Sequence, residues 1–215
     1  GFAGGYLGVD LFFVISGFII SRNILSDVHA GNFSLKEFYL RRFRRLFPAL
    51  LATVLLTLLV GTIVLPPAEL VATAVSSIYA VFSLANIHFW LSSGYFEAAA
   101  ESQPLLHTWS LSVEEQFYLF WPALLLVLAN TRQRAVVIVI LLAVPMIAGL
   151  MLRKEYPDAV FYLLPFRLPQ LMAGALIAVL SMRLVGASGN LAVLLASAGL
   201  IALSSLSVER IDPDE

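Results

Sequence analysis

Long apolar segments constrain this chain more than any other feature of its sequence. About seven of them approach the roughly 20 residues that a helix needs to cross a bilayer. Their approximate limits are residues 6–21, 46–65, 70–91, 113–129, 135–152, 160–182 and 191–206. A helix satisfies its own backbone hydrogen bonds in lipid, and these segments lack the alternating polarity of barrel strands. The sequence therefore predicts an all-α fold, a polytopic transmembrane helical bundle.

The composition agrees with a membrane location. Hydrophobic residues make up 60% of the chain and charged residues 13%, against roughly 45–50% and about 25% in soluble domains. The net charge of -1 gives no bias toward nucleic acid, and we expect no such partner. The absence of cysteine excludes thiolate metal sites and cysteine nucleophiles. The three histidines are too scattered to predict a metal site, so we expect no metal.

We expect residues 1–215 to form a single membrane-embedded domain, truncated at both ends. The chain begins on Gly1 and ends in an acidic stretch, Asp212–Glu215, and both ends look cut. The polar stretch 92–112 is too short to be a second domain. There is no P-loop, dinucleotide fingerprint or nucleophile elbow to indicate a nucleotide-binding or hydrolase fold.

The distribution of basic residues predicts an orientation. The loop between the first two spans is basic, and positive residues in short loops stay cytoplasmic. The first span then runs inward and the second runs out toward Pro66–Pro67. A second basic loop holds Arg132 and Arg134. That loop lies outside if 70–91 and 113–129 both cross the membrane, and inside if 70–91 is re-entrant; the sequence leaves both open.

Asp10 lies within the apolar stretch from Gly5 to Phe18. A charged side chain inside a span costs a few kcal/mol on insertion scales and usually faces the interior of the bundle. The alternative is a hydrated aspartate near the outer interface. The glycines around Asp10 permit close helix packing, which alone indicates no activity.

Four arginines fall within five positions where the second span begins: Arg41, Arg42, Arg44 and Arg45. On a helix, Arg41 and Arg45 share a face, as do Arg42 and Arg45. Their guanidinium groups suit phosphate oxygens. The alternative is a positive anchor at the membrane surface that binds anionic lipid head groups.

The stretch from Pro104 to Pro122 combines His107 with two glutamates that lead an apolar helix. Ser112 and Glu115 match a capping box, so we expect a helix to begin near Ser112. Glu114 or Glu115 beside His107 would make an acid/base or orienting pair. The alternative is a helix cap followed by an interfacial belt of aromatic side chains.

Arg167 lies in a further apolar run, residues 161–174. It needs either a partner inside the membrane or a position near enough to the interface for its guanidinium to snorkel. The sequence does not choose between these two.

Together these stretches resemble the acyltransferase-3 family of membrane O-acyltransferases, especially bacterial members that acetylate lipopolysaccharide O-antigen or peptidoglycan. The resemblance lies in Gly8–Phe18, in Arg42–Arg45 with Leu46–Pro48, and above all in His107–Tyr118. It implies a domain of about ten helices in the bacterial inner membrane, in contact with membrane lipid. It also implies acyl transfer from acyl-CoA, with acetyl-CoA expected, to a carbohydrate hydroxyl. A soluble domain following the C-terminal end is possible within such a family.

The resemblance implies roles for particular residues. Arg42, Arg45 and Arg41 would hold the phosphates of the donor. The catalytic candidates are Glu115, Glu114, His107 and Asp10.

The chain departs from the family pattern at two places. The essential histidine of the family belongs to a helix that would precede Gly1. Gln170 stands where members often carry a glutamate, and this weakens any charge pair between residues 167 and 170.

Two other classes of protein remain open from the residues alone. A transporter would also explain the intramembrane charges Asp10 and Arg167, although we find no inverted repeat. A non-catalytic scaffold would use the arginines only to bind anionic lipid.

Overall fold

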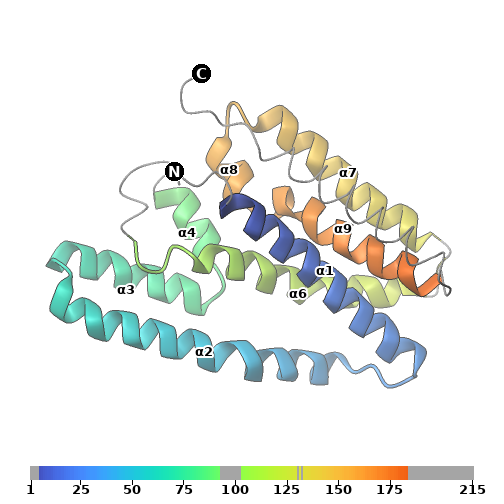
Figure 1. Cartoon of the computed structure of the whole chain (residues 1–215), viewed down its shortest axis with the longest axis horizontal. Helices are drawn as coiled ribbons and strands as arrows, with labels where there is room; N and C mark the ends of the chain where they lie inside the picture. The colour runs from blue at the N-terminus through green and yellow to red at the C-terminus, as the bar shows by residue number, and fades with distance from the viewer. Residues whose placement is uncertain (1–4, 93–102, 130, 132, 184–215) are drawn as a thin grey trace. The chain divides into compact units, whose positions relative to one another are not determined.

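The computed structural model describes residues 5–92, 103–129, 131 and 133–183, and this part of the chain contains helices and no strand (Figure 1). The all-α prediction is confirmed. The helices are α1 (Gly5–His29), α2 (Leu35–Val64), α3 (Pro67–Val81), α4 (Ala85–Ser92), α6 (Thr108–Ala129), α7 (Arg134–Leu152), α8 (Pro157–Tyr162) and α9 (Leu164–Arg183).

Five stretches of helix are long and apolar enough to cross a membrane, and the protein is an integral membrane protein. They are Gly8–His29, Leu35–Val64, Thr108–Leu128, Arg134–Leu152 and Pro157–Met182. Each contains, or largely overlaps, one of the predicted apolar segments. The predicted segment 191–206 lies outside the described residues.

The predicted segment 70–91 is not one helix. It comprises α3 and α4, separated at Ser83, whose backbone takes a positive φ of 58°. The amide of Leu84 donates to the carbonyl of Tyr79 (2.8 Å) and that of Ser83 to Ala80 (3.0 Å), the pattern of a Schellman helix end. With 15 residues and a rise of about 1.5 Å per residue, α3 is shorter than the roughly 30 Å hydrocarbon core.

Contacts along the chain divide it into two compact units. Residues 1–33 with 120–215 form one, called here the α1–α9 unit. Residues 34–119 form the other, called the α2–α6 unit. The boundary falls within α6, so the two halves of that helix belong to different units.

Close packing of α1 along α9 organises the α1–α9 unit (Figure 1). A Cβ on Gly17 would lie 2.0 Å from the carbonyl oxygen of Leu171, and a Cβ on Gly174 would lie 2.0 Å from that of Val14. Only glycine permits this approach of two backbones. Asp10, near the start of α1, bonds Arg167 and Gln170, near the start of α9, and Figure 1 shows the two helices running in the same direction.

Polar side chains on α3 are buried within the α2–α6 unit, but each is satisfied locally. Thr73, Ser76 and Ser77 are at most 5% exposed, and their hydroxyls donate to carbonyl oxygens one turn earlier at 2.8–2.9 Å. This return bonding lets a hydroxyl enter an apolar environment at little cost. The amphipathic character of residues 70–91 is therefore accommodated within the fold.

Candidate active site

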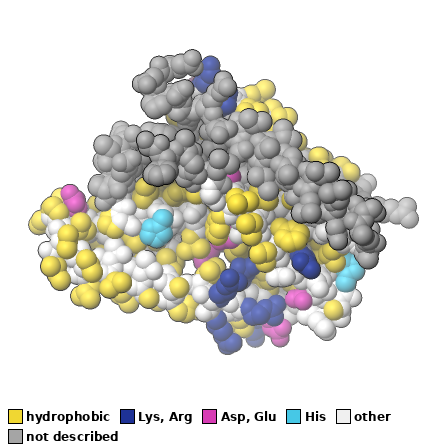
Figure 2. Space-filling model, in the orientation of Figure 1, with side chains coloured by type: hydrophobic (Ala, Val, Ile, Leu, Met, Phe, Trp, Pro, Cys, Tyr) yellow, Lys and Arg dark blue, Asp and Glu magenta, His cyan; other side chains and the backbone are white. Residues whose placement is uncertain are grey.

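The arginine cluster lies in the N-terminal part of α2, which begins at Leu35 after the N-cap residue Ser34. The hydroxyl of Ser34 accepts a hydrogen bond from the amide of Glu37 (3.5 Å), which caps the helix. Arg41, Arg44 and Arg45 are exposed, whereas Arg42 is partly buried. Figure 2 shows several Lys and Arg side chains gathered low on the face in view, with others apart from them. The chain thus presents a concentrated positive charge at one end of a spanning helix.

Arg42 differs from its neighbours because it contacts α6. Its guanidinium carbon lies 4.4 Å from the centre of the Tyr118 ring, within the range of a cation–π interaction. The hydroxyl of Tyr118 in turn donates a hydrogen bond to the carboxylate of Glu114, one turn earlier on α6. Tyr118 and Glu114 are each 5% exposed. The structure therefore brings together Arg42 and Glu114, two residues predicted separately from the sequence, through a ring expected only as part of an aromatic belt.

The outer arginines make weaker contacts. Arg41 pairs with Glu37 at 3.6 Å, but both side chains are more than half exposed, and such surface pairs contribute about 0–1 kcal/mol. The hydroxyl of Tyr39 donates to the carbonyl of Leu119 at 2.6 Å, which fixes α2 against α6 beside Tyr118. The part of α2 that carries the cluster therefore contacts α6 through Tyr39, while Arg41 and the arginines after Arg42 stay exposed.

The capping box predicted at Ser112 and Glu115 is wrong. Helix α6 begins at Thr108, after a turn over residues 104–107, so both residues lie inside the helix. There the Ser112 hydroxyl accepts from the amide of Ala85 at 3.1 Å and caps α4 instead. Ser112 does cap a helix, but that helix is α4 and not α6.

Glu115 and Gln116 bind the turn between α3 and α4. The hydroxyl of Ser83 donates to the Glu115 carboxylate. The amide nitrogen of Gln116 donates to the carbonyl of Ser83 and to Oδ1 of Asn86, both at 2.8 Å. These bonds hold Ser83 in a left-handed conformation that costs a non-glycine residue roughly 1–2 kcal/mol. Glu115 therefore has a structural partner, whereas Glu114 is joined through Tyr118 to Arg42.

His107 is exposed in the turn that precedes α6. Among the described contacts, none joins its ring to Glu114 or Glu115, so the structure does not bring together the predicted His–Glu pair. His88, which no sequence pattern singled out, stacks on Tyr79 with ring centres 4.5 Å apart and lies 3.3 Å from the Ser76 hydroxyl. No three His, Asp or Glu side chains gather into a metal site in the described residues.

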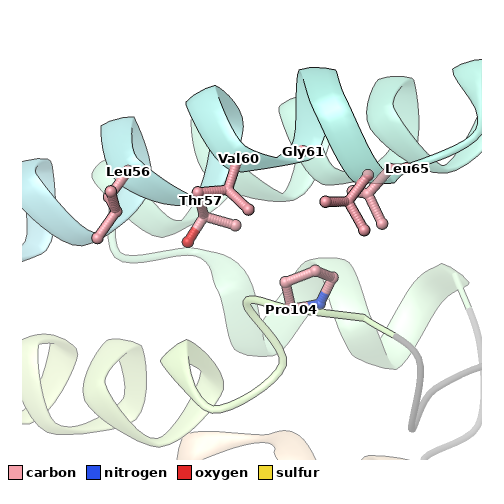
Figure 3. A pocket seen from close by; sticks show the side chains of 7 residues that line it. Leu56, Thr57, Val60, Gly61, Leu65 and Pro104 are labelled. Atoms are coloured by element: carbon pink, nitrogen blue, oxygen red, sulfur yellow. The ribbon is translucent and has the colours of Figure 1, made fainter.

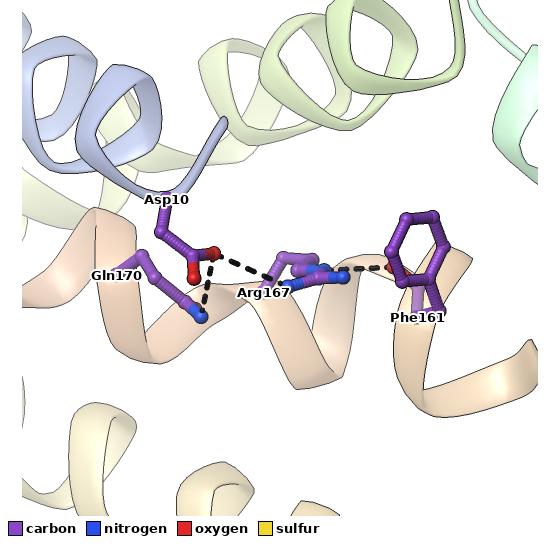
Figure 4. Close-up of polar contacts among 4 residues, drawn as sticks. All are labelled: Asp10, Phe161, Arg167 and Gln170. Atoms are coloured by element: carbon purple, nitrogen blue, oxygen red, sulfur yellow. Dashed lines mark hydrogen bonds and ion pairs between the residues drawn. The ribbon is translucent and has the colours of Figure 1, made fainter. Parts of the chain in front are cut away.

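Asp10 lies in the α1–α9 unit, where it is 3% exposed and paired with Arg167 at 3.2 Å (Figure 4). Gln170 donates to the same carboxylate oxygen at 3.2 Å. Nε of Arg167 donates to the carbonyl of Phe161 at 2.7 Å, and the guanidinium lies 4.7 Å from the Phe161 ring centre. Asp10 is thus an interior residue rather than a hydrated one, and Arg167 has a partner rather than snorkelling. Gln170 replaces the expected glutamate without removing the ion pair, because the charge comes from α1.

A pocket of about 370 Å³ opens on the C-terminal half of α2 in the α2–α6 unit (Figure 3). Its lining is almost wholly apolar and consists of Leu56, Thr57, Val60, Gly61, Val64, Leu65 and Pro104. No ionisable side chain lines it, whereas Arg42, Tyr118 and Glu114 combine charge with described contacts and form the candidate site.

Comparison with known proteins identifies several relatives. The chain is 33% identical over 181 residues to an uncharacterized protein of Haemophilus influenzae, which covers 80% of this chain and 74% of that protein. It is 38% identical over 126 residues to the peptidoglycan O-acetyltransferase OatA of Listeria monocytogenes, covering 58% of this chain and 20% of that protein. It is 39% identical over 137 residues to a putative O-acetyltransferase of Staphylococcus aureus, covering 61% of this chain and 22% of that protein.

The chain therefore spans about a fifth of the length of these two O-acetyltransferases. No solved structure matches it significantly. The family model of the acyltransferase domain, however, matches residues 2–208, which is nearly the whole chain. The resemblance seen in the motifs is confirmed, and the chain belongs to the acyltransferase-3 family.

Proposed function

We propose that this chain is part of a membrane O-acyltransferase of the bacterial inner membrane. In our proposal it transfers an acetyl group from acetyl-CoA to a hydroxyl of a cell-surface carbohydrate such as O-antigen or peptidoglycan. The observation that carries the proposal is the contact of Arg42 with Tyr118 and of Tyr118 with Glu114. Family membership supports the reaction class, and the names of the relatives support acetyl as the group transferred.

The reaction is a nucleophilic acyl transfer. The acceptor hydroxyl oxygen attacks the thioester carbonyl carbon, a C–O bond forms and the C–S bond breaks. The hydroxyl proton passes to a base and then to the departing sulfur, so that the products are an ester and coenzyme A. The family resemblance implies a histidine as this base.

Arg42, Arg45 and Arg41 are the residues to which we assign the donor phosphates. Planar guanidinium groups bind phosphate oxygens with two parallel hydrogen bonds, which lysine cannot do. Glu114 is the carboxylate that we assign to orienting the acceptor or tuning the base, because it is linked through Tyr118 to an arginine of the donor site. A low-dielectric surrounding strengthens each of these interactions.

Replacement of single arginines in the full-length protein tests the proposal. We expect Arg42→Ala and Arg45→Ala each to abolish acetyl transfer while membrane insertion stays normal. Arg42→Lys should keep only part of the acetyl transfer activity. Arg22→Ala is the matched control, since Arg22 is an exposed arginine in the C-terminal half of α1, outside the cluster. Transfer at the parent rate by both alanine variants would remove the donor site from this cluster.

A further inference from the structure

We propose that Tyr118 is a positioning residue for the donor site, holding Arg42 by the face of its guanidinium so that the edge stays available for phosphate. The inference deepens the proposed function and rests on it. Three observations carry it: the contact of Arg42 with the ring, the bond from the Tyr118 hydroxyl to Glu114, and an independent clamp beside them.

The manner in which Arg42 is held matters for what it can bind. A carboxylate partner would occupy two of the N–H groups that arginine presents along the edge of its plane. A ring beneath the guanidinium uses the face instead. Within the described part of the chain, no hydrogen bond or ion pair uses the N–H groups of Arg42, which is also the one partly buried arginine of the cluster. The Tyr118 ring thus holds Arg42 in place while the N–H groups of Arg42 stay available to a ligand.

Glu114 makes the ring a better platform. Glu114 is 5% exposed, and its carboxylate accepts a hydrogen bond from the Tyr118 hydroxyl one turn away on α6, which holds the hydroxyl end of the ring in place. Donation to a carboxylate also shifts electron density into the phenol, because hydrogen bonds in a chain polarise one another. A more electron-rich ring attracts a cation more strongly. The carboxylate meets the ring at its hydroxyl, and no described bond joins it to Arg42, so it does not occupy the N–H groups of Arg42.

A separate hydrogen bond also joins α2 to α6. Tyr39, three residues before Arg42, donates to the carbonyl of Leu119 at 2.6 Å. This bond joins the same two helices next to Tyr118 but does not contact the guanidinium. Tyr39→Phe therefore removes an interhelical bond of comparable size and leaves the platform in place, which makes it the matched control.

The test measures the binding of coenzyme A to the purified full-length protein, together with KM for acetyl-CoA and kcat. Losing a cation–π contact lowers affinity by roughly 3- to 30-fold, and we expect Tyr118→Leu to weaken coenzyme A binding by that factor. Tyr118→Phe keeps the ring and loses the bond to Glu114, so its loss should be smaller. KM for acetyl-CoA should rise in both variants while KM for the acceptor stays unchanged. Tyr39→Phe should leave coenzyme A affinity at the parent value.

A double-mutant cycle separates positioning from packing. If Tyr118 acts through Arg42, then Tyr118→Phe or Tyr118→Leu should weaken binding no further once Arg42 is alanine. Additive losses, or an equal loss in Tyr39→Phe, would overturn the inference. If Arg42→Ala weakens coenzyme A binding but neither Tyr118 variant does, the role of Tyr118 is overturned and the donor site stands. Parent-like binding in Arg42→Ala would instead overturn the donor site and the inference with it. Tyr118→Phe keeps the test valid if the leucine variant does not fold.

Discussion

Arg167 and Arg42 both lie against an aromatic ring, but they differ in the partners of their N–H groups. Arg167, 3% exposed, has a carboxylate, a carbonyl and the Phe161 ring as partners. Arg42 has the Tyr118 ring and no described partner for its N–H groups. A fully paired arginine in the membrane interior stabilises the packing of two helices, whereas one held only by its face can still bind an anion. We therefore expect pairing, rather than burial alone, to separate a structural charge such as Arg167 from a ligand-binding one such as Arg42.

The largest effect expected from this comparison is on stability. Arg167→Ala should leave the Asp10 carboxylate buried and uncompensated, and breaking a buried pair costs about 3–5 kcal/mol. We expect a large fall in the yield and melting temperature of the full-length protein, whereas Arg42→Ala should change neither. The double replacement Asp10→Asn with Arg167→Gln removes both charges and should recover part of the loss. A melting temperature for Arg167→Ala equal to that of Arg42→Ala would break the comparison.

A smaller loss should follow from crowding the contact between α1 and α9. A Cβ on Gly174 would meet backbone atoms of Val14 and Phe18, which cannot move aside as a side chain can. Overpacking of this kind costs about 1–3 kcal/mol, and we expect Gly174→Ala to lower the melting temperature accordingly. Gly8→Ala is the control on the same pair of helices, since a Cβ added there would meet nothing within 4 Å. Equal stability of the two variants would contradict the close approach.

The two adjacent glutamates should differ in rate rather than in stability. Glu114→Gln should lower acetyl transfer by more than tenfold, about 1.4 kcal/mol of transition-state stabilisation, with yield kept. Glu115→Gln should transfer at close to the parent rate, because a glutamine oxygen can still accept from the Ser83 hydroxyl. Rates of both variants measured on purified full-length protein decide the matter. Parent rates in both would make the two carboxylates structural.

Much of the fold could be predicted because hydropathy is a local property. The runs that became α2, α6 and α7 are apolar enough to identify without knowing their neighbours. The break at Ser83 could not be predicted, since it is stabilised by Glu115 and Gln116, some 30 residues away in the sequence. Local propensity alone would not place a serine in a left-handed conformation.

The sequence named Arg42 and Glu114 as candidates but predicted neither their contacts nor the part of Tyr118 between them. The sequence left open whether Asp10 and Arg167 are paired inside the bundle or lie near an interface, because 157 positions separate them and no local pattern joins them. The capping box failed because the same spacing also occurs inside a helix, where Ser112 could serve α4. Tyr118 carried a usable signal, its spacing of four residues from Glu114, which places both on one helix face.

Because α1 and α9 run parallel, the number of membrane crossings between them is constrained. Parallel spans start on the same side of a membrane, so the chain must cross an odd number of times between them. Helices α2, α6 and α7 are each long and apolar enough for one crossing. If all three cross, a fourth crossing by α3 with α4 would make α9 antiparallel to α1, so we expect residues 67–92 to enter and leave at one face of the membrane.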